Sequence, residues 1–550
     1  MESFLFDHYL KLESNPISYR SLISLRHIPK GTTVMYSYPL ACLLIQSTIK
    51  TYCNQCLKIP SLTTSSSPPL QACSKCKQIF YCSVSCQKKS WTLHHKKLCS
   101  IYISKKEKDD SNLDINNNIN KMDEEILRRV SLRIDKYLEK KSTSNFSSSS
   151  FSPLETGKER EKGKEINENE RINQVICEAF LSLMSHRENL TSDQIEKYKI
   201  IAERVWSDLK FKNISQDDLI KYLCKFSCNN FQLHDNQLFT YGEGVYPVGS
   251  FINHSCHPNS IVMYEGEKQI IKSIEDIDAE EEITISYIDA AVMNRTSRKN
   301  ILKEKYCFDC QCSRCLVNFI NIEKNKFNNK NKFKITLAKI DQLMEKGSED
   351  IKEEIIDDLI KNWSKMNNSK IESSLINNQI YFIYSKTSFI LSSLLPHLRE
   401  DTLRSSYLHS LDNLLNYLLS KVVVEKEEEE KNTFKLFSTT TISIMTKYFY
   451  NLIDAQRWHE SWKLGKLILG IYLVIYPRYH PIITLHLFTL GKCMWNDLEG
   501  GKDVIKEAID ILKISKKSIT ITHGDGENNK IVLNDVIELL GMAEKELKNL

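Results

Sequence analysis

The chain is short of glycine and of net charge. Its 16 glycines among 550 residues are about half of the usual share of roughly 7 per cent. Few glycines leave few positions for tight turns, so we expect much of the chain to be helical. The 75 lysines and arginines exceed the 70 aspartates and glutamates by only five. This near balance argues against direct nucleic-acid binding, for which a strong basic excess is typical.

Long apolar segments are also missing. The longest apolar run, Leu467–Tyr476, has ten residues, about half of the roughly 20 that a membrane-spanning helix needs. The first residues carry the charges of Glu2 and Asp7 and no apolar core follows a basic start, so no signal peptide is predicted. We expect a protein of the cytoplasm, the nucleus or both, without membrane contact and with reduced cysteines.

Cysteine, by contrast, is plentiful, and most of the 17 cysteines lie in two clusters. The first cluster supplies seven thiols and an imidazole, the eight donors that two tetrahedral zinc ions need. Thiolates favour zinc over magnesium or calcium. His95 and Cys99 are four residues apart and share a helical face, which favours His95 over the alternative His94. The thiols are those of Cys53, Cys56, Cys73, Cys76, Cys82, Cys86 and Cys99.

The second cluster is Cys310-x-Cys312-x2-Cys315. It offers three thiols where structural zinc takes four donors. The fourth position could be open, as in catalytic zinc sites, or be filled by a residue distant in sequence. Cys256, in the segment 253–259 (NHSCHPN), is a candidate for that residue.

Composition divides the remainder of the chain. Short β-like runs occupy residues 1–48, and residues 100–170 are rich in Asn, Ser, Lys and Glu. Such a segment buries too little apolar surface to offset its ordering entropy, so we expect it to be mostly disordered, with a helix possible near Ile126–Leu132. Helical periodicity returns in residues 171–228 and again in 317–550, where Leu464, Leu467 and Ile468 begin a stripe on one face.

Four segments resemble known motifs. Tyr81-Cys82-x3-Cys86-Gln87-x3-Trp91-x2-His94 resembles a MYND zinc finger. The segment NHSCHPN at 253–259 resembles the cofactor-binding core of SET-domain lysine methyltransferases. Residues 281–287 (EEITISY) resemble the SET strand that ends in the active-site tyrosine, and residues 306–315 (YCFDCQCSRC) resemble the post-SET segment.

A MYND finger inside a split SET domain, followed by a helical lobe, resembles the SET and MYND domain (SMYD) family of protein-lysine methyltransferases. The resemblance implies an α+β multidomain fold: a split SET β-fold with an inserted MYND zinc finger, a post-SET zinc segment and an all-α, TPR-like C-terminal lobe. The expected parts are the N-terminal part of SET at 1–48, the MYND finger at 49–99, the insertion at 100–170, a helical SET insert at 171–228, the SET core at 229–290, the post-SET segment at 291–316 and the helical lobe at 317–550.

The resemblance also implies how the metal ligands are shared. One zinc ion is expected on Cys53, Cys56, Cys82 and Cys86. A second is expected on Cys73, Cys76, His95 and Cys99. In this family the fourth post-SET ligand comes from the NHSC motif, so the third set is expected to be Cys256, Cys310, Cys312 and Cys315. Twelve ligands then hold three zinc ions per chain.

The activity implied is methyl transfer from S-adenosyl-L-methionine to lysine side chains of a protein, histone or non-histone. Tyr287 is the expected catalytic residue and also touches the cofactor. The tyrosines Tyr246 and Tyr306 either line the lysine channel or pack in the core. MYND fingers bind proteins, often proline-containing peptides, and we expect the chain to be a monomer. The other expected cofactor contacts are Asn229, Asn253, His254 and Phe308.

The chain departs from the family at one place. The family usually has Gly-x-Gly where this chain has Tyr19-Arg20-Ser21. A non-glycine residue in a left-handed conformation costs roughly 1–2 kcal/mol. We therefore expect cofactor binding to be about ten- to a hundredfold weaker than is usual for the family, with Arg20 able to reach the cofactor carboxylate. The alternative function is a catalytically weak adaptor that binds partners through its finger and helical lobe.

Overall fold

The fold comes from a computed structural model. It describes residues 2–15, 19–60, 69–106, 117–144, 157–315, 339–344, 350–366, 378–423, 435–497, 499–524 and 530–549.

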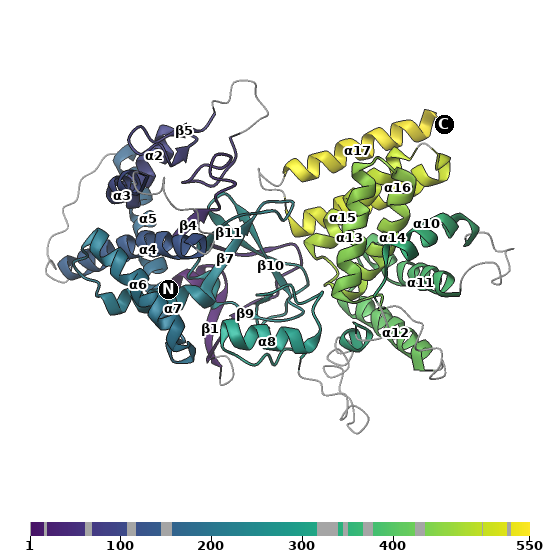
Figure 1. Cartoon of the computed structure of the whole chain (residues 1–550), viewed down its shortest axis with the longest axis horizontal. Coiled ribbons are helices and arrows are strands. Elements are labelled where there is room, and N and C mark those ends of the chain that lie inside the picture. Colours follow the sequence, from purple (N-terminus) through teal and green to yellow (C-terminus); the bar gives the residue numbers. More distant parts are fainter. Residues whose placement is uncertain are drawn as a thin grey trace.

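The central β region joins strands that are far apart in the sequence (Figure 1). Strand β3 (Thr33–Ser37) pairs antiparallel with β11 (Lys268–Ser273), and β4 (Ala41–Leu44) pairs antiparallel with β8 (Thr240–Val245). Everything between β4 and the later strands is therefore an insertion into one domain. This pairing is the split that the sequence predicts for a SET domain.

Six further strands complete this region. Strand β1 (Leu10–Asn15) forms a hairpin with β2 (Tyr19–Ser24), and β10 (Ser260–Glu265) pairs with β11. Strand β7 (Asn230–His234) pairs with β8. The short strands β9 (Asn253–His254) and β12 (Thr284–Ile285) are parallel neighbours. The strand expected over 281–287 is thus confined to two residues, although Ile283 and Ile285 are buried as the alternation predicts.

The inserted finger is small and held by cysteines. It contains the strands β5 (Gln71–Ala72) and β6 (Phe80–Tyr81), then α2 (Val84–Ser90), a π-helical turn at Trp91–His95 and α3 (Lys96–Lys106). Its hydrophobic cluster consists largely of cysteine side chains. So few apolar residues cannot form a core of their own, which is why such a module depends on metal.

The expectation of a mostly disordered segment at 100–170 is wrong for most of its described part. Helix α4 (Asn117–Ser144) runs through this region, and Ile126, Leu127 and Val130 are fully buried. The helix packs against α6 (Ser192–Leu209), α7 (Gln216–Asn229) and β4, and α5 (Gly157–Ser182) lies beside it. The possible helix near Ile126–Leu132 is thus present and longer than the sequence indicates, because one apolar stripe is sufficient to anchor a helix when neighbours cover it. Residues 107–116 and 145–156 lie outside the described part.

Most of the remaining chain is helical, as the low glycine content predicts. The C-terminal lobe forms the green and yellow half of Figure 1, beyond the strands of the central region. Nearer the strands lie α1 (Glu2–Asp7), α6 (Ser192–Leu209), α7 (Gln216–Asn229) and α8 (Arg295–Tyr306). The lobe contains α10 (Glu353–Met366), α11 (Asn378–Glu400), α12 (Arg404–Val423), α13 (Thr439–Asp454), α14 (Trp458–Ile475), α15 (Pro481–Asn496), α16 (Gly501–Thr522) and α17 (Lys530–Asn549).

Helix α14 is the centre of this lobe. Within Ser461–Ile475 only Lys466 is not buried. The helix is therefore buried on nearly all sides, and not only along the one apolar face that the sequence predicts. The helix packs against α11, α13 and α15. At Gly465 an added side chain would meet Leu490 and Phe449 at 3.0 Å. Among the described residues, no helix has both the length and the apolar composition that crossing a bilayer requires.

Polar contacts join the helical lobe to the central region. Lys30 Nζ lies 3.2 Å from Asp401 Oδ1, and the Tyr476 hydroxyl donates to Asp289 at 3.3 Å. The core of the lobe also includes Ile261 and Ile270 from the strands β10 and β11. Lobe and sheet therefore share one hydrophobic core, which fixes the lobe beside the site described next.

Candidate functional site

The finger gathers two sets of four metal ligands. In the first set, Cys82 Sγ lies 3.6 Å from Cys56 Sγ and 3.6 Å from Cys86 Sγ. Two Zn–S bonds of about 2.3 Å at a tetrahedral angle place sulfurs about 3.8 Å apart. The spacing is therefore that of a zinc site. The donor atoms of each set all lie within 4.8 Å of one another, and the sets are Cys53, Cys56, Cys82 and Cys86, and Cys73, Cys76, His95 and Cys99.

The second of these sets decides between the two candidate histidines. His95 Nε2 lies 3.3 Å from Cys73 Sγ and 3.6 Å from Cys76 Sγ. His94 is in none of the ligand sets found among the described residues. The π-helical turn over Trp91–His95 continues into α3, which carries Cys99, so His95 and Cys99 reach the same point. The donors of the finger are thus grouped in the interleaved way that the resemblance predicts.

The third set lies at the end of the central region. Cys256 Sγ is 3.9 Å from Cys310 Sγ and 3.6 Å from Cys315 Sγ, and Cys312 completes the four donors. Cys256 follows β9, whereas the other three follow α8. Cys256, which is distant in sequence, therefore supplies the fourth donor of the cluster, and no open position remains for catalytic zinc. None of the 17 cysteines forms a disulfide.

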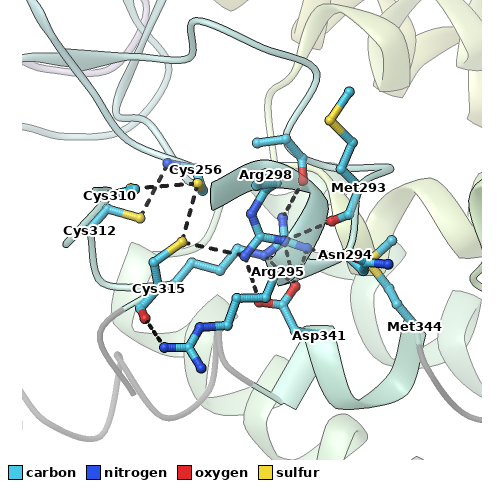
Figure 2. A network of polar contacts seen from close by, with 12 residues as sticks. Cys256, Met293, Asn294, Arg295, Arg298, Cys310, Cys312, Cys315, Asp341 and Met344 are labelled. Atoms are coloured by element: carbon cyan, nitrogen blue, oxygen red, sulfur yellow. Dashed lines mark hydrogen bonds and ion pairs between the residues drawn. The ribbon is translucent and has the colours of Figure 1, made fainter. Parts of the chain in front are cut away.

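Two arginines lie along one side of this third cluster (Figure 2). Arg298 Nη2 lies 3.6 Å from Cys315 Sγ, and Arg295 Nη2 donates to the Cys315 carbonyl at 2.6 Å. Four thiolates around Zn²⁺ carry a net charge of about −2, which nearby guanidinium groups offset. Both arginines belong to α8, so this helix is tied to the cluster by charge as well as by chain connectivity.

Asp341 extends the network into the helical lobe. Its carboxylate accepts two hydrogen bonds from Arg298, at 2.8 and 2.7 Å, and two from Arg314, at 3.1 and 2.9 Å. All three side chains are almost fully buried. Figure 2 shows the carboxylate of Asp341 facing Arg298, on the side of that residue opposite the thiols. Arg314 also donates to the Ala290 carbonyl at 3.1 Å.

Beside this cluster is a cavity of about 670 Å³. Its walls come from β2, from the end of α7, from residues 250–259, from Thr284 and Tyr287, and from the post-SET segment. This volume suits a nucleotide-sized ligand. All six residues expected to touch the cofactor line this cavity: Arg20, Asn229, Asn253, His254, Tyr287 and Phe308. Tyr306 lines it as well.

Tyr287 and His254 hold each other in place. The Tyr287 hydroxyl donates to the Ile252 carbonyl at 2.6 Å, and the Tyr287 backbone N–H donates to His254 Nδ1 at 3.0 Å. That bond leaves the imidazole proton on Nε2, which lies 3.2 Å from Cys256 Sγ. Burial raises the pKa of Tyr287 and lowers the pKa of His254 to about 3. Both side chains are therefore neutral near pH 7.

Aromatic rings crowd the same wall of the cavity. The centroid of the Tyr287 ring lies 5.0 Å from that of Tyr306 and 6.3 Å from that of Phe308, the latter pair edge to face. The Tyr306 hydroxyl donates to the Tyr287 carbonyl at 3.1 Å. Tyr246 lies elsewhere: it is fully buried, and its hydroxyl donates to the Glu267 carbonyl at 3.0 Å. Of the two channel candidates, only Tyr306 lines the cavity, and Tyr246 packs in the core.

Two asparagines fix the backbone around the cavity. Asn253 Nδ2 donates to the Arg20 carbonyl at 2.6 Å and to Glu282 Oε1 at 2.7 Å, which ties β2 to the segment before β12. Asn229 Nδ2 donates to the Lys225 carbonyl at 2.8 Å, at the end of α7. Their amide groups are thus part of the scaffold as well as of the cavity wall.

The segment that replaces the expected glycines is extended. Residues Tyr19–Ser24 form β2, and neither Arg20 nor Ser21 has a positive φ. Ser21 is buried, and its hydroxyl accepts a hydrogen bond from Asn15 Nδ2 at 2.7 Å. The guanidinium of Arg20 lies 4.3 Å from the centre of the Phe251 ring. The expected left-handed strain is therefore absent at these two residues, while the effect on cofactor affinity stays a prediction.

Several residues of the cavity were not predicted. Asn259 closes the NHSCHPN segment, and its Nδ2 donates to the Glu282 carbonyl at 2.8 Å. This asparagine could have been found, since it lies in the motif. Glu282 and Arg404 also line the cavity. Arg404 begins α12 of the helical lobe and carries no motif, so only the tertiary structure places it there.

Fold and site together define a class of protein: a split SET-type β fold that carries an inserted MYND finger, a post-SET zinc cluster beside a cofactor-sized cavity, and a helical lobe. The family model of the MYND finger matches residues 53–99. The chain is 26% identical to histone-lysine N-methyltransferase ASHR1 of Arabidopsis thaliana over 94% of its own length and 93% of that protein.

Two further relatives agree. The chain is 27% identical to histone-lysine N-methyltransferase SMYD3 of Mus musculus over 52% of its length and 56% of that protein. It is 22% identical to N-lysine methyltransferase SMYD2 of Homo sapiens over 81% of its length and 82% of that protein. The predicted resemblance to the SET and MYND domain family is confirmed.

Proposed function

We propose that this chain transfers a methyl group from S-adenosyl-L-methionine to lysine side chains of a protein substrate. The observation that carries the proposal is the cavity of about 670 Å³ in which Asn253, His254, Tyr287 and Phe308 meet beside the post-SET cluster. The names of the relatives favour the enzyme over the alternative, a catalytically weak adaptor.

The cavity fits such a cofactor in size and in chemistry. It combines amide groups, from Asn229 and Asn253, with the aromatic face of Phe308 and the guanidinium of Arg20. Amides suit the polar ends of the molecule, an aromatic ring suits a purine, and a guanidinium suits a carboxylate. When bound, the cofactor supplies an electrophilic methyl group on a cationic sulfur.

Tyr287 is proposed as the catalytic residue. Its hydroxyl hydrogen is directed to the Ile252 carbonyl, so the lone pairs of the oxygen remain to accept a hydrogen bond from the substrate amine. Burial raises the pKa of Tyr287, and the hydroxyl therefore orients the amine without removing its proton. Burial of the lysine lowers its own pKa and favours the neutral amine that attacks. Positioning and electrostatics thus carry the catalysis.

His254 acts as a positioning residue in this proposal. Its ring accepts the Tyr287 N–H and faces the Cys256 thiol, so it couples the tyrosine to the third metal cluster. Because its pKa is lowered to about 3, its charge does not change over the physiological range. Tyr306 holds the Tyr287 carbonyl from the other side. The hydroxyl is fixed before substrate arrives, as pre-organised catalysis requires.

The substrate is proposed to be a protein, histone or non-histone. The finger is proposed as a docking module for protein, including proline-containing peptides. We also propose a monomer that works in the cytoplasm, the nucleus or both.

The test is the Tyr287→Phe variant. Purified wild-type and variant proteins are incubated with labelled S-adenosyl-L-methionine and with histones or a cytosolic protein extract. Loss of the hydroxyl should lower methyl transfer at least ~100-fold, because the amine loses its orienting acceptor. Calorimetric titration with the cofactor should give nearly the same affinity for both proteins.

Tyr264→Phe is the matched control. Tyr264 is also a buried tyrosine whose hydroxyl makes a hydrogen bond, from Gln269 Nε2 at 3.4 Å, but it lies outside the cavity. Its loss should leave the rate unchanged. Equal activity of the Tyr287 variant would remove this tyrosine from the mechanism. A wild-type chain that binds no cofactor would refute the proposed function itself.

A further inference from the structure

A second and larger cavity, of about 1000 Å³, lies between the finger and the paired helices α4 and α5. Residues 38–42 of the central region form its floor, and Leu93 and His94 of the finger form one wall. It shares no lining residue with the cofactor cavity. The methyl-transfer proposal leaves this cavity without a role.

Positive charge dominates its lining. Among the described residues, six cationic side chains face it, against two carboxylates, those of Glu170 and Glu267. Glu170 pairs with Lys140 at 2.5 Å, and Glu267 pairs with Lys89. The two carboxylates of the lining are therefore already used, and Arg129 pairs with Glu125 at 2.9 Å, so the excess of positive charge rests mainly on Arg133 and Lys136. The cations are Lys89, Arg129, Arg133, Lys136, Lys140 and Lys141.

Arg133 is the centre of this excess. Its Nε donates to Asn173 Oδ1 at 2.9 Å, and its Nη1 donates to the carbonyls of Pro39 and Leu40 at 2.7 and 2.8 Å. These acceptors fix the guanidinium but carry no charge. Within the described part of the chain, Arg133 has no carboxylate partner and its Nη2 makes no hydrogen bond.

Arg133 is half-buried, whereas the fully buried arginines of the chain have carboxylate partners. Arg128 pairs with Glu124 and Asp208, Arg298 with Asp341, and Arg478 with Glu275. Removing a guanidinium from water without a counter-charge is costly, so a fixed and uncompensated one is typical of a site that receives an anion.

His94 provides a second, independent observation. Its Nδ1 atom is buried, and it has no hydrogen-bond partner among the described residues. Buried polar atoms in native proteins are nearly always satisfied, and one that is not requires an explanation, of which a bound ligand is one. His94 lines the same cavity as Arg133, from the finger side. A ligand with an anionic group for Arg133 and a polar atom for His94 Nδ1 would provide both side chains with a partner.

We propose that this cavity binds an acidic peptide segment of a partner protein. Its volume exceeds that needed by a small anion and lies at the upper end of ligand pockets. Its lining also contains the amides of Asn54, Gln55 and Asn173. One end of each amide makes an internal hydrogen bond, and the other end suits a peptide backbone. Carboxylates of the peptide would meet Arg133 and Lys136. The site is thus a contact for partners that is separate from the lysine channel, and it does not depend on the proposed reaction.

The probe is a short fluorescein-labelled peptide of aspartate, glutamate, serine and glycine, without lysine or proline. Fluorescence polarisation measures its binding to the full, zinc-loaded chain. The isosteric peptide with asparagine and glutamine, and a single-stranded oligonucleotide, are measured in parallel. The acidic peptide should bind, more weakly as ionic strength rises, and S-adenosylhomocysteine should not displace it.

Two variants locate the site. Arg133→Gln should weaken peptide binding about ten- to a hundredfold, as loss of a charge-assisted hydrogen bond does. Lys136→Glu is the second variant, in case Arg133→Gln does not fold. Because Lys136 is exposed, its replacement should not disturb folding. It should weaken binding about tenfold. Lys502→Glu makes the same charge change on an exposed residue of α16 outside the cavity and should have no effect.

Three results would overturn the proposal. They are equal binding of the neutral peptide, binding that Lys136→Glu leaves unchanged, and binding of the oligonucleotide but not of the acidic peptide. The last would assign the cavity to nucleic acid. None of these results bears on methyl transfer, which the Tyr287 variant tests separately.

Discussion

The finger and the post-SET cluster use the same four-donor chemistry over different distances along the chain. All eight ligands of the finger lie between Cys53 and Cys99. The third cluster joins Cys256 to residues 310–315, and Arg298 and Asp341 extend it to α8 and to the helical lobe. A local site stabilises its own module. A site assembled from distant segments can also fix the position of other residues on those segments, here His254 and Phe308 of the cofactor cavity.

The largest expected effect comes from replacing one zinc ligand of the post-SET cluster, which can be compared with the same replacement in the finger. Cys256→Ser should lower the zinc content from about three to about two ions per chain. It should also weaken S-adenosyl-L-methionine binding at least ~100-fold, because metal binding and local folding are coupled at the cavity wall. Elemental analysis and calorimetric titration measure the two quantities.

Cys53→Ser is the counterpart in the finger. It should remove one zinc ion in the same way and yet leave cofactor binding close to that of the wild type, because no finger ligand lines the cofactor cavity. If both variants lose cofactor binding equally, then the distinction between a local and an assembled site is wrong.

Asp341 tests the connection to the helical lobe. Asp341→Asn leaves two buried arginines without their shared carboxylate, and breaking such a pair typically costs about 3–5 kcal/mol. We expect the free energy of unfolding to fall by that amount, with the zinc content still at about three. Denaturant titration and elemental analysis provide the readouts. Asp503→Asn is the control, because Asp503 is 93% exposed and should change stability little.

The adjacent histidines His94 and His95 test which imidazole binds zinc in the finger. His95→Gln should cost the finger one zinc ion, because Nε2 of His95 is a donor of the second set. His94→Gln should keep all three ions, because His94 is in none of the ligand sets found among the described residues. Retention of all three ions by both variants would show that the two adjacent imidazoles are interchangeable, and loss of an ion from both would contradict the assignment of His95 alone.

Ser21→Gly should have the smallest effect. Ser21 is extended and hydrogen bonded, so glycine relieves no strain there. We expect about 1–2 kcal/mol less stability, from the lost hydrogen bond and the added chain entropy. Cofactor affinity should stay within about twofold. A tenfold gain in affinity would instead show that the serine side chain obstructs the cofactor.

The parts of the site that could be predicted have local signatures. Ligand spacing indicates the metal donors, and the segments NHSCHPN and EEITISY indicate the cavity residues Asn253, His254 and Tyr287. Arg404 and Asp341 cannot be identified in this way, because only the packing of the helical lobe brings them to the central region. The length of helix α4 escapes prediction for a related reason. The sequence indicates only a possible helix near Ile126–Leu132, because a long polar segment dilutes the apolar stripe, and burial against α6 and α7 defines the full helix.

The split pairing of the strands has a consequence for synthesis on the ribosome. Strands β3 and β4 leave the ribosome early, but their partners β11 and β8 begin only at residues 268 and 240. The finger, whose ligands end at residue 99, can take up zinc and fold while those strand edges are still unpaired. Unpaired edges invite association with other chains. In the translation interval between the finger and β11, the edges of β3 and β4 are therefore open to association with other chains.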